Sequence, residues 1–181
     1  MKTLVIHAED SSTEFLCPIY QTIVDRTVLR KGFTKNEIAE QIKVHDRIIM
    51  LGHGCPDGLF AVGQFETNNS LIIDSSLITL LAEKEENIYI WCHANQFVEK
   101  HNLKGFYTGM FVSEFLEVVY CELPLVEDIL IDESNDGFSR IVSKYVNDSK
   151  SVIYKKVLEE YQLIANKNLV AAYNIERIFR N

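Results

Sequence analysis

The sequence predicts an α/β fold, a three-layer sandwich whose mostly parallel central sheet is flanked by helices on both faces. The first observation is that short apolar runs alternate with segments of helical periodicity over most of the chain. The second is that two runs, 47–51 and 87–91, are short and rich in isoleucine, and glycines and a proline stop the first. Helices that connect parallel strands form right-handed crossovers and so cover both faces of the sheet.

The first half of the chain predicts two helices between three strands. The expected elements are, in order, a strand at 2–8, a helix from Ser12, a strand at 27–30, a helix from Thr34 and a strand at 47–51. Pro18 fits the first helix only in its early turns, because proline breaks a helix interior. Thr34 and Glu37 have the spacing of a capping box, so the second helix begins at Thr34.

The second half continues the alternation and ends in a helical extension. The expected elements are a hairpin arm at 59–65, a helix capped by Asp74, a strand at 87–91, a helix at 95–101, a strand at 106–112 and a helix at 113–122. Apolar residues then repeat at helical spacing, which predicts a helical extension at about 121–166. For the tail, alternating apolar residues favour an edge strand at 168–175, whereas Val170, Tyr173 and Asn174 would suit a helix.

Length and charge limit the kinds of protein to consider. The 181 residues, 47% of them hydrophobic, fit a single domain at 1–181 with its sheet core at about 2–120. The net charge of -8 argues against nucleic acid or a membrane as partner. The apolar segment Leu4 to Ile6 is too short for a signal peptide or membrane span, so we expect a cytoplasmic protein. The four cysteines lack CxxC spacing, which favours reduced thiols. The sequence indicates no oligomeric state.

Polar and reactive residues stand where the expected strands end. They are Glu9 and Asp10, His53 and Gly54, Cys92 and His93, and Ser113 and Glu114. Parallel strands end at one edge of their sheet, where ligands bind, so His53 and Cys92 should lie together. A thiol of pKa about 8.5 needs a neighbouring base such as His53 to become a nucleophile at neutral pH. The backbone N–H groups of Gly54 and Cys92 would hold an oxyanion, as acyl transfer to a thiol requires.

The same residues carry a resemblance to a known family. A strand that ends on His-Gly at 53–54, followed by a strand that ends on Cys92, resembles the caspase-like cysteine peptidases, which include caspases, metacaspases, clostripain, gingipains and separase. Residues 13–16, Asp74 and 105–107 are similar to stand-alone bacterial members. The resemblance covers the sheet to about residue 120. It implies a His53–Cys92 dyad, an oxyanion donor at Gly54, a peptide or protein substrate and no cofactor.

Three residues near the expected nucleophile are candidates for substrate binding. Asp10, at the end of the first strand, could receive a basic substrate side chain, although capping the following Ser-rich turn is the favoured role. Trp91 and His93 flank Cys92 and are the other two candidates. The sequence departs from the family here, since family members usually carry Ala or Asp before the nucleophile.

The candidate site residues also have interpretations that involve no catalysis. His53 could cap a turn, and Cys92 could be a buried small hydrophobe. Cys17, Cys55 and Cys121 are expected to be plain packing or loop residues. A zinc site of His53, Cys55, Cys92 and His93 is disfavoured, because adjacent residues of an extended segment point to opposite faces. The prediction is therefore a cysteine hydrolase, specifically an endopeptidase, without a metal. The alternative is a catalytically silent binding or regulatory module with the same fold and Trp91 in the substrate channel.

Overall fold

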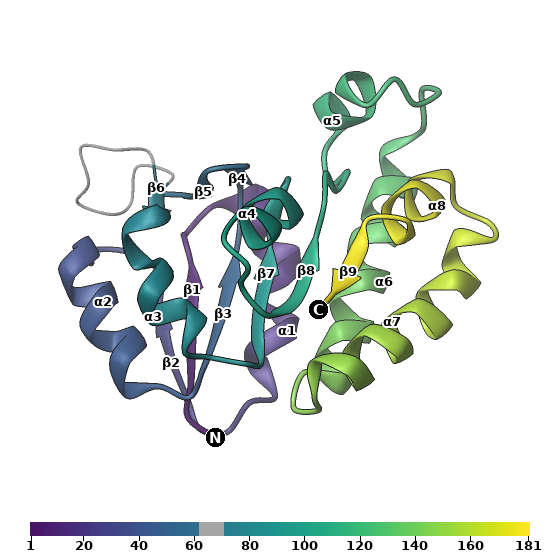
Figure 1. Cartoon of the computed structure of the whole chain (residues 1–181). Coiled ribbons are helices and arrows are strands. Elements are labelled where there is room, and N and C mark those ends of the chain that lie inside the picture. The colour runs from purple at the N-terminus through teal and green to yellow at the C-terminus, as the bar shows by residue number, and fades with distance from the viewer. Residues whose placement is uncertain (62–70) are drawn as a thin grey trace.

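The structure is a computed structural model that describes residues 1–61 and 71–181. Its centre is a six-stranded sheet of order β2-β1-β3-β7-β8-β9 (Figure 1). The strands are β1 (Thr3–His7), β2 (Arg26–Leu29), β3 (Arg47–Leu51), β7 (Asn87–Ile90), β8 (Gly105–Thr108) and β9 (Ile178–Arg180). Neighbouring strands pair in parallel except β9, which is antiparallel to β8. The predicted α/β class with a mostly parallel sheet is confirmed.

A small second sheet follows β3. Its antiparallel strands are β4 (Gly54–Cys55), β5 (Gly58–Phe60) and β6 (Leu71–Ile73). The hairpin arm predicted at 59–65 begins within β5, and its residues beyond Ala61 lie outside the described part of the chain.

Helices occupy the connections between the strands of the main sheet. They are the 3-10 helices η1 (Ser11–Leu16) and η2 (Ser75–Leu77) and the α-helices α1 (Pro18–Gln21), α2 (Lys35–Val44), α3 (Ile78–Ala82), α4 (Ala94–Lys100), α5 (Phe115–Tyr120), α6 (Asp128–Tyr145), α7 (Lys150–Ala165) and α8 (Leu169–Ile175). Thr34 caps α2, and its capping box with Glu37 is present as predicted. Asp74 caps η2 by accepting a hydrogen bond from Ser76 N–H (2.9 Å).

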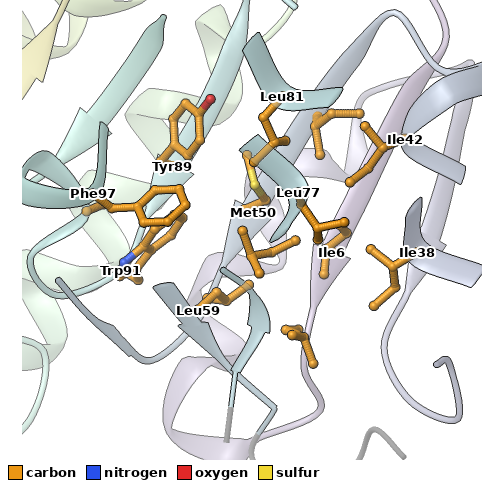
Figure 2. Close-up of a cluster of buried hydrophobic side chains, with 14 of the residues drawn as sticks. Ile6, Ile38, Ile42, Met50, Leu59, Leu77, Leu81, Tyr89, Trp91 and Phe97 are labelled. Carbon is orange, nitrogen blue, oxygen red and sulfur yellow. The ribbon is translucent and has the colours of Figure 1, made fainter. Parts of the chain in front are cut away.

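Successive residues of each strand enter different halves of the core, as the two-residue period of a strand requires. On one face of the sheet, Ile6 and Met50 pack against helices α2, α3 and α4. Figure 2 shows Ile38 of α2, Leu81 of α3 and Phe97 of α4 in this cluster.

The other face of the sheet is covered by η1, α1 and the C-terminal helices. Val5 and Ile49 pack here with Ile19 of α1 and Phe138 of α6. They precede Ile6 and Met50, which face the first cluster. Helix α7 adds Val157, which is fully buried. The sheet therefore lies between two helical layers, and its C-terminal strand ends lie at the upper edge in Figure 1, beside β4 and β5.

The tail differs from the favoured prediction. Residues 168–175 do not form an edge strand but the helix α8, and the edge strand β9 follows it. Asn168 starts the helix because its side chain accepts a hydrogen bond from Ala171 N–H (3.0 Å). Val170, Ala171 and Asn174 are buried, a spacing that a helix presents on one side and a strand does not. The helical alternative was the right interpretation.

The helix expected from Ser12 is also different, because it consists of two short pieces. The 3-10 helix η1 comes first, and Asp10 caps it by accepting from Ser12 N–H (2.9 Å). Pro18 is then the first residue of α1. A proline is tolerated there because a first-turn N–H has no partner within the helix.

The strand expected at 106–112 is shorter than predicted and stops at Thr108. The backbone of Val112 is then held by a side chain instead of a neighbouring strand. Asn174 of α8 accepts from Val112 N–H (2.7 Å) and donates to Val112 C=O (2.8 Å). The helix expected at 113–122 likewise covers only residues 115–120. In Figure 1 this helix, α5, lies above the strand ends, and its buried Val118 packs with Ile131 of α6 and Val170 of α8.

Of the helices in the two described ranges, none combines the length and the apolar character that crossing a membrane requires.

Replacing Asn174 by alanine should destabilise the protein by about 2–4 kcal/mol, because two buried backbone groups of Val112 would lose their partners. Urea unfolding followed by circular dichroism measures this change. The matched control, Asn147→Ala at an exposed loop position, should change the free energy of unfolding by less than about 0.5 kcal/mol. Equal losses in both variants would show that the Asn174 contacts do not hold this segment.

Candidate active site

Parallel pairing of β3 and β7 brings His53 and Cys92 to the same level of the sheet. Leu51 pairs with Ile90, and each site residue follows two positions later in its own segment. The pairing continues past β3, since Gly52 N–H donates to Ile90 C=O (3.1 Å). Both residues therefore stand at the C-terminal edge of adjacent strands, as the sequence predicts.

His53 and Cys92 line one small cavity between the strand ends and η1. Its other walls are Thr13, Phe15, Leu16, Gly52, Ile90, Trp91, Thr108, Phe111 and Ser113. The space open to the centre of a water molecule is about 20 Å³, and one water needs roughly 10–15 Å³. The cavity in this form has room for a water molecule and not for a substrate side chain. The His53 side chain is 27% exposed, so solvent also reaches its ring.

Glycine is required at position 54 because the chain passes very close to Trp91. A Cβ atom on Gly54 would lie 2.2 Å from Trp91 Cδ1. Gly54 faces Leu59 of β5, and the hydrogen bond beside this pair runs from Phe60 N–H to His53 C=O (2.8 Å). In that register the N–H of Gly54 points away from β5. It is directed to the open side of β4, and the lining of the cavity does not include Gly54.

Ser12 connects the imidazole of His53 to a carboxylate. Ser12 Oγ lies 2.7 Å from His53 Nε2 and donates its proton to Asp10 Oδ1 at 2.8 Å. The second carboxylate oxygen, Asp10 Oδ2, is 3.9 Å from the same ring nitrogen. Asp10 Oδ1 also accepts a hydrogen bond from the Ser12 backbone N–H, and this bond holds the pKa of the carboxyl below its usual value. Asp10 is therefore ionised at neutral pH.

This network assigns a proton to one nitrogen of His53. The single hydroxyl proton of Ser12 goes to Asp10, so Ser12 Oγ can only accept from His53 Nε2–H. In the neutral ring Nδ1 then carries the lone pair. His53 is thus oriented by a hydroxyl and a carboxylate and has Nδ1 as its basic nitrogen.

The thiol of Cys92 contacts a carboxylate of α5. Its Sγ lies 3.2 Å from Glu117 Oε1 and 3.5 Å from Phe111 C=O. Burial is the main cause that raises the pKa of the Cys92 thiol well above its usual value. The negative charge of Glu117 and the hydrogen bond that the thiol donates to it raise the pKa further. These neighbours keep the thiol protonated, which is the opposite of the activation that an adjacent imidazolium would give.

Glu117 is held in this position by the segment that leads into α5. Its Oε2 accepts hydrogen bonds from Ser113 N–H (2.6 Å), Ser113 Oγ (2.9 Å) and Glu114 N–H (3.1 Å). The carboxylate therefore joins the N-terminus of α5 to Cys92. Any movement of this segment away from the sheet would remove the carboxylate from the thiol.

The three residues expected to bind substrate occupy different settings. Asp10 is the N-cap of η1, the role the sequence favours for it. Trp91 lines the cavity but is only 2% exposed, and its Nε1 donates to Cys55 C=O (3.2 Å). Figure 2 shows Trp91 beside Phe97 in the core. His93 has a left-handed backbone (φ 67°) before α4, and the cavity lining does not include it. Substrate binding by these residues stays a prediction.

The four residues of the disfavoured zinc site are not gathered into a metal centre. Among residues 1–61 and 71–181, no group of three or more histidine, cysteine, aspartate or glutamate side chains could hold a metal ion. His93 Nδ1 instead lies 3.2 Å from Gln96 Nε2.

Sequence reasoning did not assign Ser12 and Glu117 to the site. Ser12 belongs to a turn recognised only as a cap. Glu117 has the position of a capping residue, three after Glu114, and nothing in the sequence links it to Cys92, 25 positions away. Both contacts arise from the tertiary fold, which brings η1 and α5 to the strand ends.

Comparison with known proteins finds no match: no family model, no curated protein and no solved structure matches the chain.

The variant Glu117→Gln should make Cys92 more reactive. Removing a nearby negative charge lowers the pKa of the thiol, by about one unit or more for a carboxylate in contact. At pH 7 to 8, below the pKa in either protein, the thiolate fraction and the iodoacetamide rate at Cys92 should rise about tenfold. Peptide mass spectrometry at several times measures this rate.

The matched control is Glu133→Gln, at an exposed carboxylate of α6, and it should label Cys92 at the wild-type rate. If Glu117→Gln also leaves the rate unchanged while the protein stays folded, Glu117 does not control the thiol.

Proposed function

We propose that this chain is a cysteine hydrolase of the caspase-like type, most simply an endopeptidase, with Cys92 as nucleophile and His53 as base. The observation that carries the proposal is the common level of the two residues on β3 and β7 and their presence in one cavity. The pair lies at the C-terminal edge of a parallel sheet, which is where α/β folds of this kind bind ligands.

In the proposed reaction His53 Nδ1 takes the proton of Cys92, and the sulfur attacks the carbonyl carbon of the scissile bond. The N–H groups of Gly54 and Cys92 stabilise the oxyanion that forms. The imidazolium then donates its proton to the leaving amine, and a water molecule deprotonated by His53 hydrolyses the thioester. Asp10 and Ser12 stabilise the charged imidazole during both steps.

The described form would be a resting state of such an enzyme. The thiol is paired with Glu117, and the cavity has no room for a substrate. The proposal therefore requires Glu117 and the N-terminal end of α5 to move before turnover. The same two observations favour the second candidate, a silent binding module in which Cys92 never becomes a nucleophile.

Substitution of the two site residues distinguishes these functions. Cys92→Ala should lower kcat for a responsive fluorogenic peptide by about 10⁴-fold or more, and His53→Ala should cost nearly as much. The double variant should lose little beyond either single variant, because residues that act as a unit are strongly non-additive.

The control Cys121→Ala removes a thiol outside the cavity lining and should keep wild-type turnover. Circular dichroism should show a folded protein in every variant. Additive losses at positions 53 and 92, or no turnover by either wild type or Glu117→Gln on basic, acidic and apolar peptides, would favour the silent module.

A further inference from the structure

Helix α5 exposes its apolar side, which reverses the usual arrangement of a surface helix. Four of its large side chains, between 44% and 76% exposed, are Phe115, Leu116, Val119 and Tyr120. At about 100° per residue these four span an arc of about 140° around the helix. The opposite side carries Glu117, which contacts Cys92, and the buried Val118. A surface helix normally buries its apolar stripe and exposes its charges. The four exposed residues therefore form an apolar surface, which we name the α5 face.

Exposed apolar residues continue from α5 towards α6. Leu125, in the connection between the helices, is 76% exposed, and Ile129, in the first turn of α6, is 55% exposed. Half of the twelve exposed large hydrophobic residues in the described parts of the chain thus fall within 115–129. Single exposed apolar residues need no explanation, but a concentration of this kind is typical of a surface that another molecule covers.

The same segment carries the net negative charge of the chain. The 26 acidic residues exceed the 18 basic ones by eight. Residues 113–136 contain no Lys, Arg or His and eight acidic residues, which are Glu114, Glu117, Glu122, Glu127, Asp128, Asp132, Glu133 and Asp136. The rest of the chain is therefore balanced in charge. Within residues 1–61 and 71–181, none of these eight forms an ion pair with a basic side chain.

Charge decides which kind of molecule suits the α5 face. A second copy of the chain in a two-fold dimer would bring identical surfaces together, so the acidic residues of the two copies would repel each other. Helices that lie on anionic membranes carry Lys and Arg on their polar side, whereas residues 113–136 have none. A partner helix with basic residues beside an apolar stripe matches both features of the surface, its exposed apolar side chains and its unpaired carboxylates.

We propose that the α5 face binds a basic amphipathic helix of another protein. The apolar stripe of that helix covers Leu116 and Tyr120, the two most exposed residues of the face. Its Lys or Arg residues pair with exposed carboxylates that follow the face, such as Glu122 and Glu127. Aromatic residues such as Tyr120 are enriched at protein interfaces. This inference goes beyond the proposed hydrolase and does not depend on it, because the α5 face lies opposite the side of α5 that meets Cys92.

A designed peptide is the probe for this surface. It is a helix of about 14 residues, about 21 Å long, with leucine on one side and lysine on the other. Fluorescence anisotropy of the labelled peptide should show saturable binding to the wild-type protein, and added salt should weaken the binding. A scrambled peptide of the same composition lacks the apolar stripe, and a peptide with glutamate in place of lysine lacks the matching charge. Each should bind at least about tenfold more weakly.

The apolar contribution is tested on the protein side. Leu116→Ser with Tyr120→Ser should weaken binding of the leucine-lysine peptide by about tenfold or more, because the peptide then buries less apolar surface. The matched control is Val24→Ser with Val44→Ser, two exposed valines outside α5, which should leave the affinity unchanged. Circular dichroism should show a folded protein in each variant, since the replaced side chains are exposed.

The charge contribution has its own pair of variants. Glu122→Gln with Glu127→Gln should weaken binding of the leucine-lysine peptide by about threefold or more, because two exposed ion pairs are lost. The matched control Asp25→Asn with Glu83→Gln changes two exposed acidic residues elsewhere and should leave the affinity unchanged.

Several results would overturn the proposal. They are the absence of peptide binding, equal binding of the designed and scrambled peptides, and binding that survives Leu116→Ser with Tyr120→Ser. Sedimentation that shows a dimer of the wild-type protein, lost in the same double variant, would assign the α5 face to a second copy instead. Co-sedimentation with phosphatidylglycerol vesicles, lost in that variant, would assign it to a membrane and would also overturn the proposal.

Discussion

The pairing of β3 with β7 is the constraint on which the whole site depends. These two buried strands run in parallel with Leu51 opposite Ile90, so the residues two positions later come to one level. A shift of one residue would turn every side chain of β7 to the opposite face and separate Cys92 from His53. The register is fixed by the core itself, since β3 and β7 pack against helices on both sides. The position of the site is therefore a consequence of core packing.

Local charges decide what the placed residues can do. His53 is oriented through Ser12 by the ionised Asp10, which prepares Nδ1 to accept a proton. The thiol that should provide this proton contacts Glu117, which stabilises its protonated form. The chain thus combines an oriented base with a thiol whose ionisation is opposed. Because the opposing carboxylate lies on α5 and not on the sheet, a movement of α5 that breaks the packing of Val118 against α6 and α8 could release the thiol without unfolding the sheet.

The sequence could predict the features that depend on local periodicity. It predicted the mostly parallel sheet, the capping box of α2 and the placement of His53 and Cys92 at neighbouring strand ends. It failed for residues 168–175, where the alternating apolar residues favour a strand but Val170, Ala171 and Asn174 share one side of a helix, and packing against α6 and α7 decides between the two. It could not find the contact of Glu117 with Cys92, because only the tertiary fold brings these residues together.

The central claim is that Cys92 and His53 form one nucleophilic unit. A peptidyl acyloxymethyl ketone tests it most directly, because this electrophile reacts with a cysteine that an adjacent base activates. Intact mass and peptide mapping of the Glu117→Gln protein should show a single adduct, on Cys92, and the adduct should disappear when His53→Ala is added. Adducts spread over Cys17, Cys55 and Cys121, or an adduct on Cys92 that persists without His53, would contradict the account.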